Sequence, residues 1–137
     1  MIPSNAPAFN PVTLRPGTVL STGRPFYRHV GMVTDRFVNG MPTVISSSGG
    51  RGMVVEEPLD SFRVQGDLRV DGYLGSLPPE MVLARARAKL GTSYSLFNWN
   101  CEQFVRYAHG LNQESPQLAT VASLLILALV IAGLSRA

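Results

Sequence analysis

The chain of 137 residues has room for one small domain with its own core. A content of 45% hydrophobic and 15% charged residues excludes a disordered chain. The single cysteine excludes an internal disulfide and a cysteine-based zinc site, and it fits a reducing compartment. The net charge of +3 includes one local group of basic residues, Arg85, Arg87 and Lys89. These three lie in a predicted helix, where a solvated polar face explains them better than nucleic-acid binding does.

Residues 1–16 are predicted to form an irregular arm, because prolines interrupt them repeatedly and they contain no apolar run. No secretory signal is recognisable in this stretch. We therefore expect the domain that follows, residues 17–112, to be cytoplasmic.

The next part of the chain alternates short β-branched or apolar runs with turn residues. Strands are predicted at residues 17–21, 28–35, 43–47, 53–56 and 67–70, with turns at 39–40 and 49–52. One helical turn is predicted at residues 58–62, and a helix over 80–90 is introduced by two prolines. This order, strands first and helices last, predicts an α+β domain with a small antiparallel sheet packed on helices.

A further helix is predicted to begin at Cys101, because Asn100 is a strong helix N-cap residue. Apolar residues follow three, four and seven positions later, so the sulfur should face the core and Gln103 should face water. The N–H groups and dipole at a helix start favour a thiolate, and we expect a lowered pKa for Cys101. The alternative is that this lone cysteine is simply a small buried apolar side chain.

A cysteine nucleophile needs a nearby base, and the chain contains two histidines. His109 lies on the same predicted helix as Cys101, about 12 Å away by helical rise, so it is excluded as the base and is explained as a cation near the helix C-terminus. His29 remains, in the predicted strand 28–35. It shares a face with Gly31, whose missing side chain should let the cysteine helix approach. The alternative is a core histidine bonded to a backbone carbonyl.

The last part of the chain is different in character. Residues 118–134 carry no charge and are apolar on every side, and seventeen helical residues span about 26 Å. We predict a membrane-anchor helix over residues 117–135. The alternative is a buried C-terminal core helix.

Two motifs resemble a known family. Residues 25–31 (PFYRHVG) resemble the histidine motif of the lecithin:retinol acyltransferase-like proteins, and residues 100–105 (NCEQFV) resemble their Asn-Cys-Glu-His-Phe-Val box. The resemblance covers residues 17–110. It implies a circularly permuted NlpC/P60, papain-like fold and a thiol enzyme that uses no cofactor or metal.

The resemblance also implies an activity. That activity is acyl transfer or hydrolysis on lipid esters, of the phospholipase/acyltransferase type, through an acyl thioester on Cys101. His29 would be the base, and the helix start at Asn100 and Cys101 would hold the oxyanion. The implied partners are a phospholipid or other acyl lipid and a membrane, without nucleic acid, while the oligomeric state stays open.

Two positions depart from the family pattern. Gln103 replaces the histidine of the cysteine box, and Ser46 stands where the family commonly has a second catalytic histidine, with Ser48 on the same side as a further possibility. A serine hydroxyl can accept a hydrogen bond from an imidazole but offers no charge to an imidazolium. Two other functions therefore remain open: a weak or inactive membrane-associated binding or remodelling module of the H-box/NC type, and an amide or isopeptide hydrolase.

Overall fold

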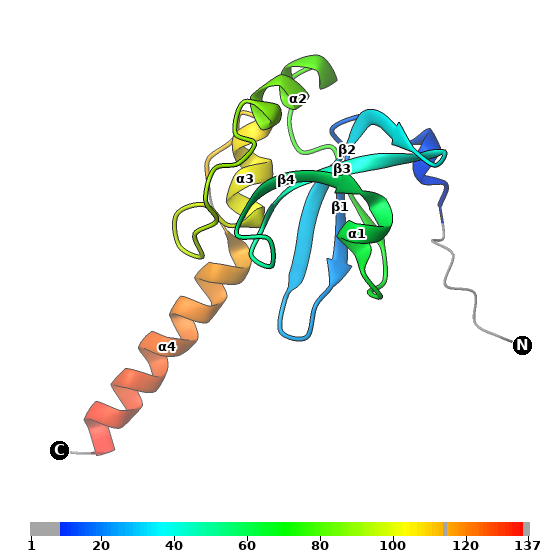
Figure 1. Cartoon of the computed structure of the whole chain (residues 1–137). Helices are drawn as coiled ribbons and strands as arrows, with labels where there is room; N and C mark the ends of the chain where they lie inside the picture. Colours follow the sequence, from blue (N-terminus) through cyan, green and yellow to red (C-terminus); the bar gives the residue numbers. More distant parts are fainter. Residues whose placement is uncertain (1–8, 114, 136–137) are drawn as a thin grey trace, which may run out of the picture.

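The computed structural model describes residues 9–113 and 115–135. Within them, five strands form one antiparallel sheet in the order β4-β3-β2-β1-β5, and the predicted α+β class is confirmed (Figure 1). The elements are η1 (Pro11–Thr13), β1 (Val19–Gly23), β2 (Arg28–Val38), β3 (Met41–Ser48), β4 (Met53–Pro58), α1 (Leu59–Arg63), β5 (Arg69–Gly72), α2 (Pro79–Arg87), α3 (Cys101–Ala108) and α4 (Pro116–Ser135).

The sheet is covered on both faces, because successive side chains of a strand point to opposite sides. Met32 of β2 faces α2 and α3 in a cluster that contains Phe104, whereas Val33 faces α1 in a second cluster that contains Phe62. Both phenylalanines are fully buried. Truncating either one to alanine is expected to cost about 3–5 kcal/mol of stability.

Two sequence expectations need refinement. Helix α2 ends at Arg87 and passes through irregular backbone to Gly91, whose φ of 82° is available to glycine at little cost. The arm is partly ordered, since η1 lies in it and Phe9 and Leu14 pack on the α1 side of the core. The rest of the arm, residues 1–8, lies outside the described residues.

The group of basic residues on and after α2 is engaged within the domain. Arg87 lies 2.7 Å from Asp35 and 2.9 Å from Glu56, and Arg85 donates to the carbonyl of Tyr107 at 2.9 Å. Lys89 lies over the Tyr107 ring. Each of these three basic residues therefore has a partner within the domain.

Strand β2 pairs with its two neighbours over different lengths. It pairs with β1 from Arg28 to Met32, but pairing with β3 begins only at Met32. At that end of the sheet, Ser46 to Ser48 of β3 pair with β4. On the side away from β1, residues 28–31 of β2 therefore have no partner among the described strands, and this is where the site lies.

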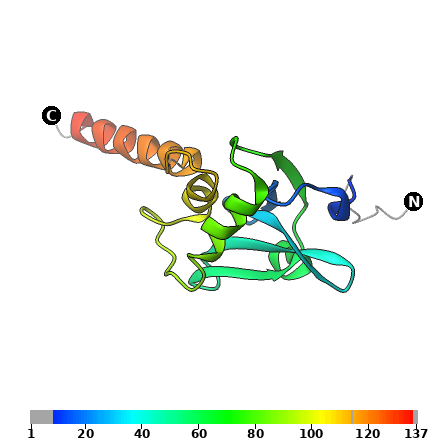
Figure 2. The same ribbon diagram turned by 90° about the horizontal axis from the view of Figure 1, so that it is seen from above.

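Helix α4 leaves the domain and points away from it (Figures 1 and 2). Its window Pro116–Gly133 has a mean hydropathy of 2.0, and none of that window is buried inside the described part of the chain. By length and composition this helix can cross a membrane. The alternative of a buried core helix does not hold in this structure.

Candidate active site

The start of α3 is closed by a reciprocal pair of hydrogen bonds. The Asn100 side chain accepts from the Gln103 N–H at 2.9 Å, and the Gln103 side chain accepts from the Asn100 N–H at 2.8 Å. Gln103 also donates to the Phe97 carbonyl at 2.6 Å and is only 7% exposed. The expectation that Gln103 faces water is wrong, because its amide both donates and accepts in a capping box.

Cys101 begins α3 and is buried, with 5% of its surface exposed. Burial raises the pKa of its thiol, although hydrogen bonding from the backbone of Val30, and then of Glu102 and Cys101 itself, lowers it. The expectation of a lowered pKa is therefore wrong, because desolvation of the sulfur outweighs the helix start. The resting side chain is a neutral thiol.

His29 is also buried, at 3% exposure. Its Nε2 lies 3.2 Å from the hydroxyl of Ser46, and its ring packs on Phe62 with a centroid distance of 4.9 Å. Burial, together with the charge of Arg24, lowers the pKa of His29 from 6.5 to about 4. The imidazole is consequently neutral at pH 7 and has the protonation state that a base requires.

Gly31 has a different purpose from the expected one. A Cβ there would lie 2.7 Å from Val44 Cγ1 and 2.9 Å from Phe62 Cε2. The missing side chain thus makes room for α1 and not for the cysteine helix. The reason is strand alternation, which directs residues 29, 31 and 33 to the α1 face while α3 packs on the other face.

The unpaired edge of β2 brings the thiol and the imidazole to the same end of the strand. The backbone of Val30 lowers the pKa of the Cys101 thiol, which places it beside the sulfur, and His29 is the preceding residue. Within the described part of the chain, no hydrogen bond joins Cys101 to His29. The His29 ring leaves β2 on the α1 face, whereas Cys101 reaches the strand from α3, and their catalytic roles stay predictions.

The two candidate serines differ in what they touch. Ser46 is fully buried and bonds His29, whereas the Ser48 hydroxyl accepts from the backbone N–H of Arg51. Between them, Ser47 points to the α3 face and donates to the Trp99 carbonyl at 2.9 Å. Ser46 is therefore the serine in position to orient the imidazole.

His109 is buried at the end of α3 and does not act there as a cation. Its Nε2–H donates to the Gly17 carbonyl at 2.8 Å, and burial lowers its pKa. The expectation of a charged residue at the helix C-terminus is wrong, because a buried imidazole with one carbonyl partner is better accommodated as the neutral form. His109 instead fastens α3 to the residues before β1.

A cavity of about 490 Å³ lies beside Cys101, and most of its lining surface is apolar. It is formed by the β1–β2 turn, the loop before α3, the start of α3 and the first turns of α4. The lining residues are Phe26, Tyr27, Tyr94, Leu96, Asn100, Cys101, Glu102, Ser115, Gln117, Leu118, Thr120 and Val121. The contribution of α4 was not anticipated from sequence, where this helix appeared only as an anchor.

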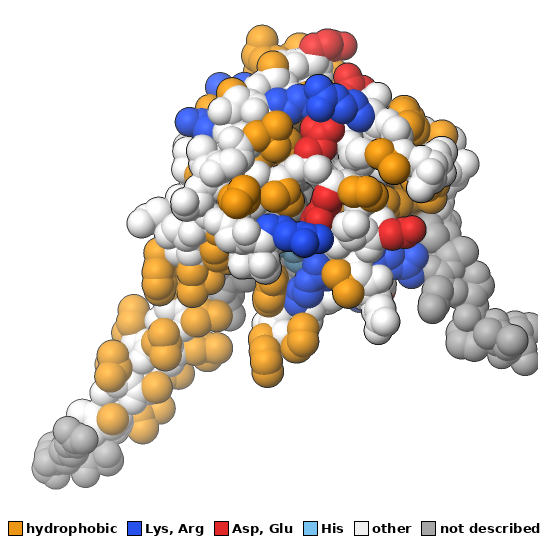
Figure 3. Space-filling model, in the orientation of Figure 1, with side chains coloured by type: hydrophobic (Ala, Val, Ile, Leu, Met, Phe, Trp, Pro, Cys, Tyr) orange, Lys and Arg blue, Asp and Glu red, His pale blue; other side chains and the backbone are white. Residues whose placement is uncertain are grey.

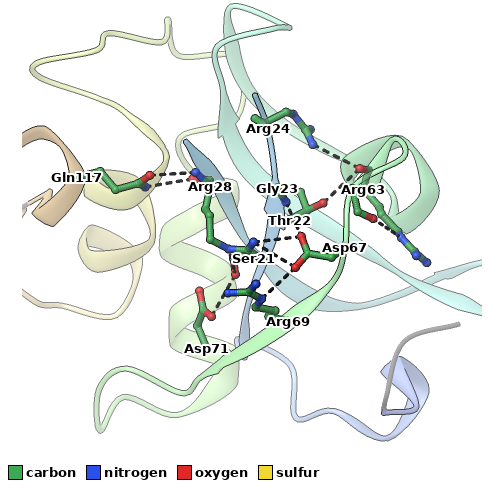
Figure 4. Close-up of polar contacts among 11 residues, drawn as sticks. Ser21, Thr22, Gly23, Arg24, Arg28, Arg63, Asp67, Arg69, Asp71 and Gln117 are labelled. Atoms are coloured by element: carbon green, nitrogen blue, oxygen red, sulfur yellow. Dashed lines mark hydrogen bonds and ion pairs between the residues drawn. The ribbon is translucent and has the colours of Figure 1, made fainter. Parts of the chain in front are cut away.

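Three polar groups fasten the first turn of α4 to the site. The Gln117 amide pairs with both backbone groups of Arg28, accepting from its N–H at 2.9 Å and donating to its carbonyl at 3.1 Å (Figure 4). The Glu102 carboxylate accepts from the Ser115 hydroxyl and from the Gln117 N–H. The Gln117 amide thus takes the place of a strand on β2, two residues from the contact between Val30 and Cys101.

The comparison with protein families agrees with this arrangement. A family model described as lecithin retinol acyltransferase matches residues 12–111, which include β1 to β5 and α1 to α3. The chain belongs to the lecithin retinol acyltransferase family. A search of curated proteins gave no match.

Membership of the lecithin retinol acyltransferase family supports acyltransferase-type chemistry and a lipid substrate in general. The observed α+β fold is consistent with the NlpC/P60-like architecture expected of such a domain. Among the described residues, no three His, Cys, Asp or Glu side chains converge to hold a metal ion.

Proposed function

We propose that the protein transfers or hydrolyses acyl groups of lipid esters through a thioester on Cys101, at the surface of the membrane that α4 enters. The observation that carries this proposal is the apolar cavity shared by Cys101 and the first turns of α4. A lipid lying beside α4 can place its acyl chain in that cavity and its ester carbonyl near the sulfur. The domain is proposed to lie on the cytoplasmic side.

The reaction begins from two neutral groups. His29 takes the thiol proton through an intervening water molecule, since no hydrogen bond joins the two groups in the described chain, as the sulfur attacks the ester carbonyl. The tetrahedral intermediate then breaks its bond to the alkoxy oxygen, and the imidazolium returns the proton to the leaving alcohol. Water or an acceptor hydroxyl attacks the thioester, the C–S bond breaks, and the proton returns to the sulfur.

We propose that backbone N–H groups at the start of α3 stabilise the oxyanion by hydrogen bonding. The backbone of Glu102 and of Cys101 lowers the pKa of the thiol, so these two N–H groups are directed toward the sulfur. Those of Asn100 are occupied, since its backbone N–H binds Gln103 and its side-chain amide donates to the Leu96 carbonyl at 2.9 Å. We therefore assign Asn100 to capping. Among the described residues, the N–H groups of Cys101 and Glu102 have no other partner than the resting sulfur, and we assign them to the oxyanion that forms beside it when the sulfur bonds the carbonyl carbon.

The test uses the full chain in vesicles that contain phospholipid with a labelled acyl chain. We expect protein-bound label that hydroxylamine releases, as it does from a thioester, and that is absent from Cys101→Ala. His29→Gln should slow labelling by roughly 100-fold or more, whereas His109→Gln should slow it far less. A Cys101→Ala variant that is labelled as strongly as the parent would overturn the assignment of the nucleophile.

A second candidate is a non-catalytic module that binds lipid in the same cavity. It is favoured by Ser46, which cannot stabilise an imidazolium by charge, and by the raised pKa of the thiol. It predicts vesicle binding without any acyl label on Cys101. No contact in the described chain favours the amide or isopeptide hydrolase.

A further inference from the structure

We propose that two loops beside the root of α4 insert into the same leaflet as the helix and hold the mouth of the Cys101 cavity at the depth of lipid ester groups. The loops are the β1–β2 turn, through Phe26, and the segment before α3, through Leu96 and Phe97. The partner is a lipid bilayer. The inference rests on the proposed function insofar as that function requires α4 to cross a membrane.

The three side chains are large, apolar and exposed to water in the isolated chain. Phe26 is 99% exposed, Phe97 66% and Leu96 54%. They come from segments about seventy residues apart in sequence, yet Phe26 and Leu96 line the same cavity as Leu118 of α4. A group of exposed apolar side chains around one opening indicates a surface that is covered in use.

Hydrogen bonds fix the first turn of helix α4 to the domain. The Gln117 amide holds the backbone of Arg28, which follows the β1–β2 turn, and Glu102 holds Ser115 and the Gln117 N–H. These contacts fix the first turn of the helix relative to both loops. The position of the loops in the membrane therefore follows from the position of α4.

The length of α4 sets the depth. Its twenty residues span about 30 Å, which matches the hydrocarbon core of a bilayer, so the whole helix is needed to cross. Pro116 then lies at the boundary of the hydrocarbon, and Leu118 and Val121 lie just inside it. The cavity opens at this boundary, between headgroups and acyl chains, where phospholipid esters are found.

The loops lie on the membrane side of the domain in this arrangement. Figure 1 shows the β1–β2 turn and the loop before α3 flanking the root of α4, on the side toward which the helix leaves. Figure 3 shows hydrophobic side chains along α4 and also on the adjacent part of the domain. Aromatic side chains such as Phe26 and Phe97 are stable at this depth of a bilayer.

The opposite end of β2 supplies a matched control. Phe37 is 55% exposed and lies next to the β2–β3 turn. Strand β2 has eleven residues, so its two ends are separated by about 33 Å. Phe37 is thus an exposed phenylalanine at a hairpin that this orientation keeps out of the membrane.

The experiment measures the depth of single labels in full-length protein reconstituted into phosphatidylcholine vesicles. In a Cys101→Ser background, Phe26→Cys, Phe97→Cys and Phe37→Cys are each labelled with bimane, and the vesicles carry lipids brominated at shallow or deep acyl positions. We expect shallow bromines to lower the fluorescence at positions 26 and 97 at least twofold and to leave position 37 unchanged. Carbonate extraction of the same samples reports whether α4 is integrated.

Three outcomes decide the matter. Quenching at positions 26 and 97 but not at 37 supports the insertion. Quenching at all three or at none, in protein that resists carbonate, overturns the insertion while leaving the anchor and the proposed function intact. Protein that carbonate extracts overturns the anchor and the insertion together.

An activity measurement gives independent support, because Phe97 does not line the cavity. Phe97→Ser is expected to reduce turnover of vesicle lipid about fivefold or more and to leave turnover of a dispersed short-chain ester unchanged. Phe37→Ser should change neither rate. Equal losses of Phe97→Ser on both substrates would mean that the loop acts on the chemistry and not on docking.

Discussion

Cys101 and His29 are both neutral at rest because each is almost fully buried. Their pKa values move apart, with that of the thiol raised and that of the imidazole lowered, both chiefly by desolvation. A thiolate–imidazolium pair is therefore not the resting state. In the proposed reaction the proton would move only when the substrate arrives, and the neutral thiol would not react unselectively between turnovers.

This arrangement predicts slow alkylation of Cys101. The pH midpoint of iodoacetamide alkylation should lie above the ~8.5 of a free thiol, since burial disfavours the thiolate. The midpoint is read from rate against pH, with intact mass confirming a single adduct. A midpoint clearly below that of a free thiol would show that an ion pair exists at rest.

The buried His29 is also predicted to make the free energy of unfolding depend on pH. Its pKa is about 4 in the folded chain and 6.5 in the unfolded one, so between these values the unfolded state binds more protons. The full stability is present above pH 6.5 and decreases toward pH 4, by on the order of 3 kcal/mol. Urea unfolding at several pH values measures the loss.

The matched variant is His29→Gln, which cannot titrate. Its stability should decrease less over the same pH interval, and the part that remains is expected from His109, whose pKa burial also lowers. Identical pH dependence in the parent and in His29→Gln would contradict the buried, neutral imidazole.

Ser46 is predicted to act by positioning the imidazole. Ser46→Ala removes the hydrogen bond to His29 and should slow acylation roughly tenfold, with a changed pH profile, while Ser48→Ala leaves the rate near that of the parent. Single-turnover labelling measures both. If Ser48→Ala proves the slower variant, the serines have been assigned in the wrong order.

At the scale of elements, the first turn of α4 lines the cavity beside Cys101 and also begins the proposed membrane anchor. Gln117→Ala removes two hydrogen bonds to Arg28 and leaves the apolar span unchanged. We expect the variant to remain carbonate-resistant but to acylate several-fold more slowly, since two such bonds are together worth about 1–3 kcal/mol. The neighbouring Gln113→Ala, at an exposed position, is the control. A rate equal to that of the parent would show that the helix is only a tether.

The strands and α3 were predictable because local signals agree with the tertiary structure. Asn100 followed three residues later by Gln103 is a capping-box pattern, and that pattern was available to correct the expectation that Gln103 faces water. The pKa of Cys101 was not predictable, because it depends on burial by residues distant in sequence. Nor was the pairing of Gln117 with Arg28, which are 89 residues apart.

At the scale of the whole molecule, the domain and α4 form one unit with Cys101 at their junction. The cavity, the loops that line it and the exposed apolar helix α4 lie together at one end of the sheet. At this end β2 is not paired with β3. The family domain alone covers residues 12–111. The lipid selectivity of this protein is expected to depend also on α4, which lies beyond the family match.

The central claim is that Cys101 takes an acyl group from a lipid ester. Intact mass spectrometry of the full chain tests it, after mixing with vesicles of a diester phosphatidylcholine or of its diether analogue. We predict one added acyl mass with the diester, located on Cys101 and removed by hydroxylamine, and no added mass with the diether. Vesicle-bound protein that gains no acyl mass from the diester, over times that allow many turnovers, would contradict the account.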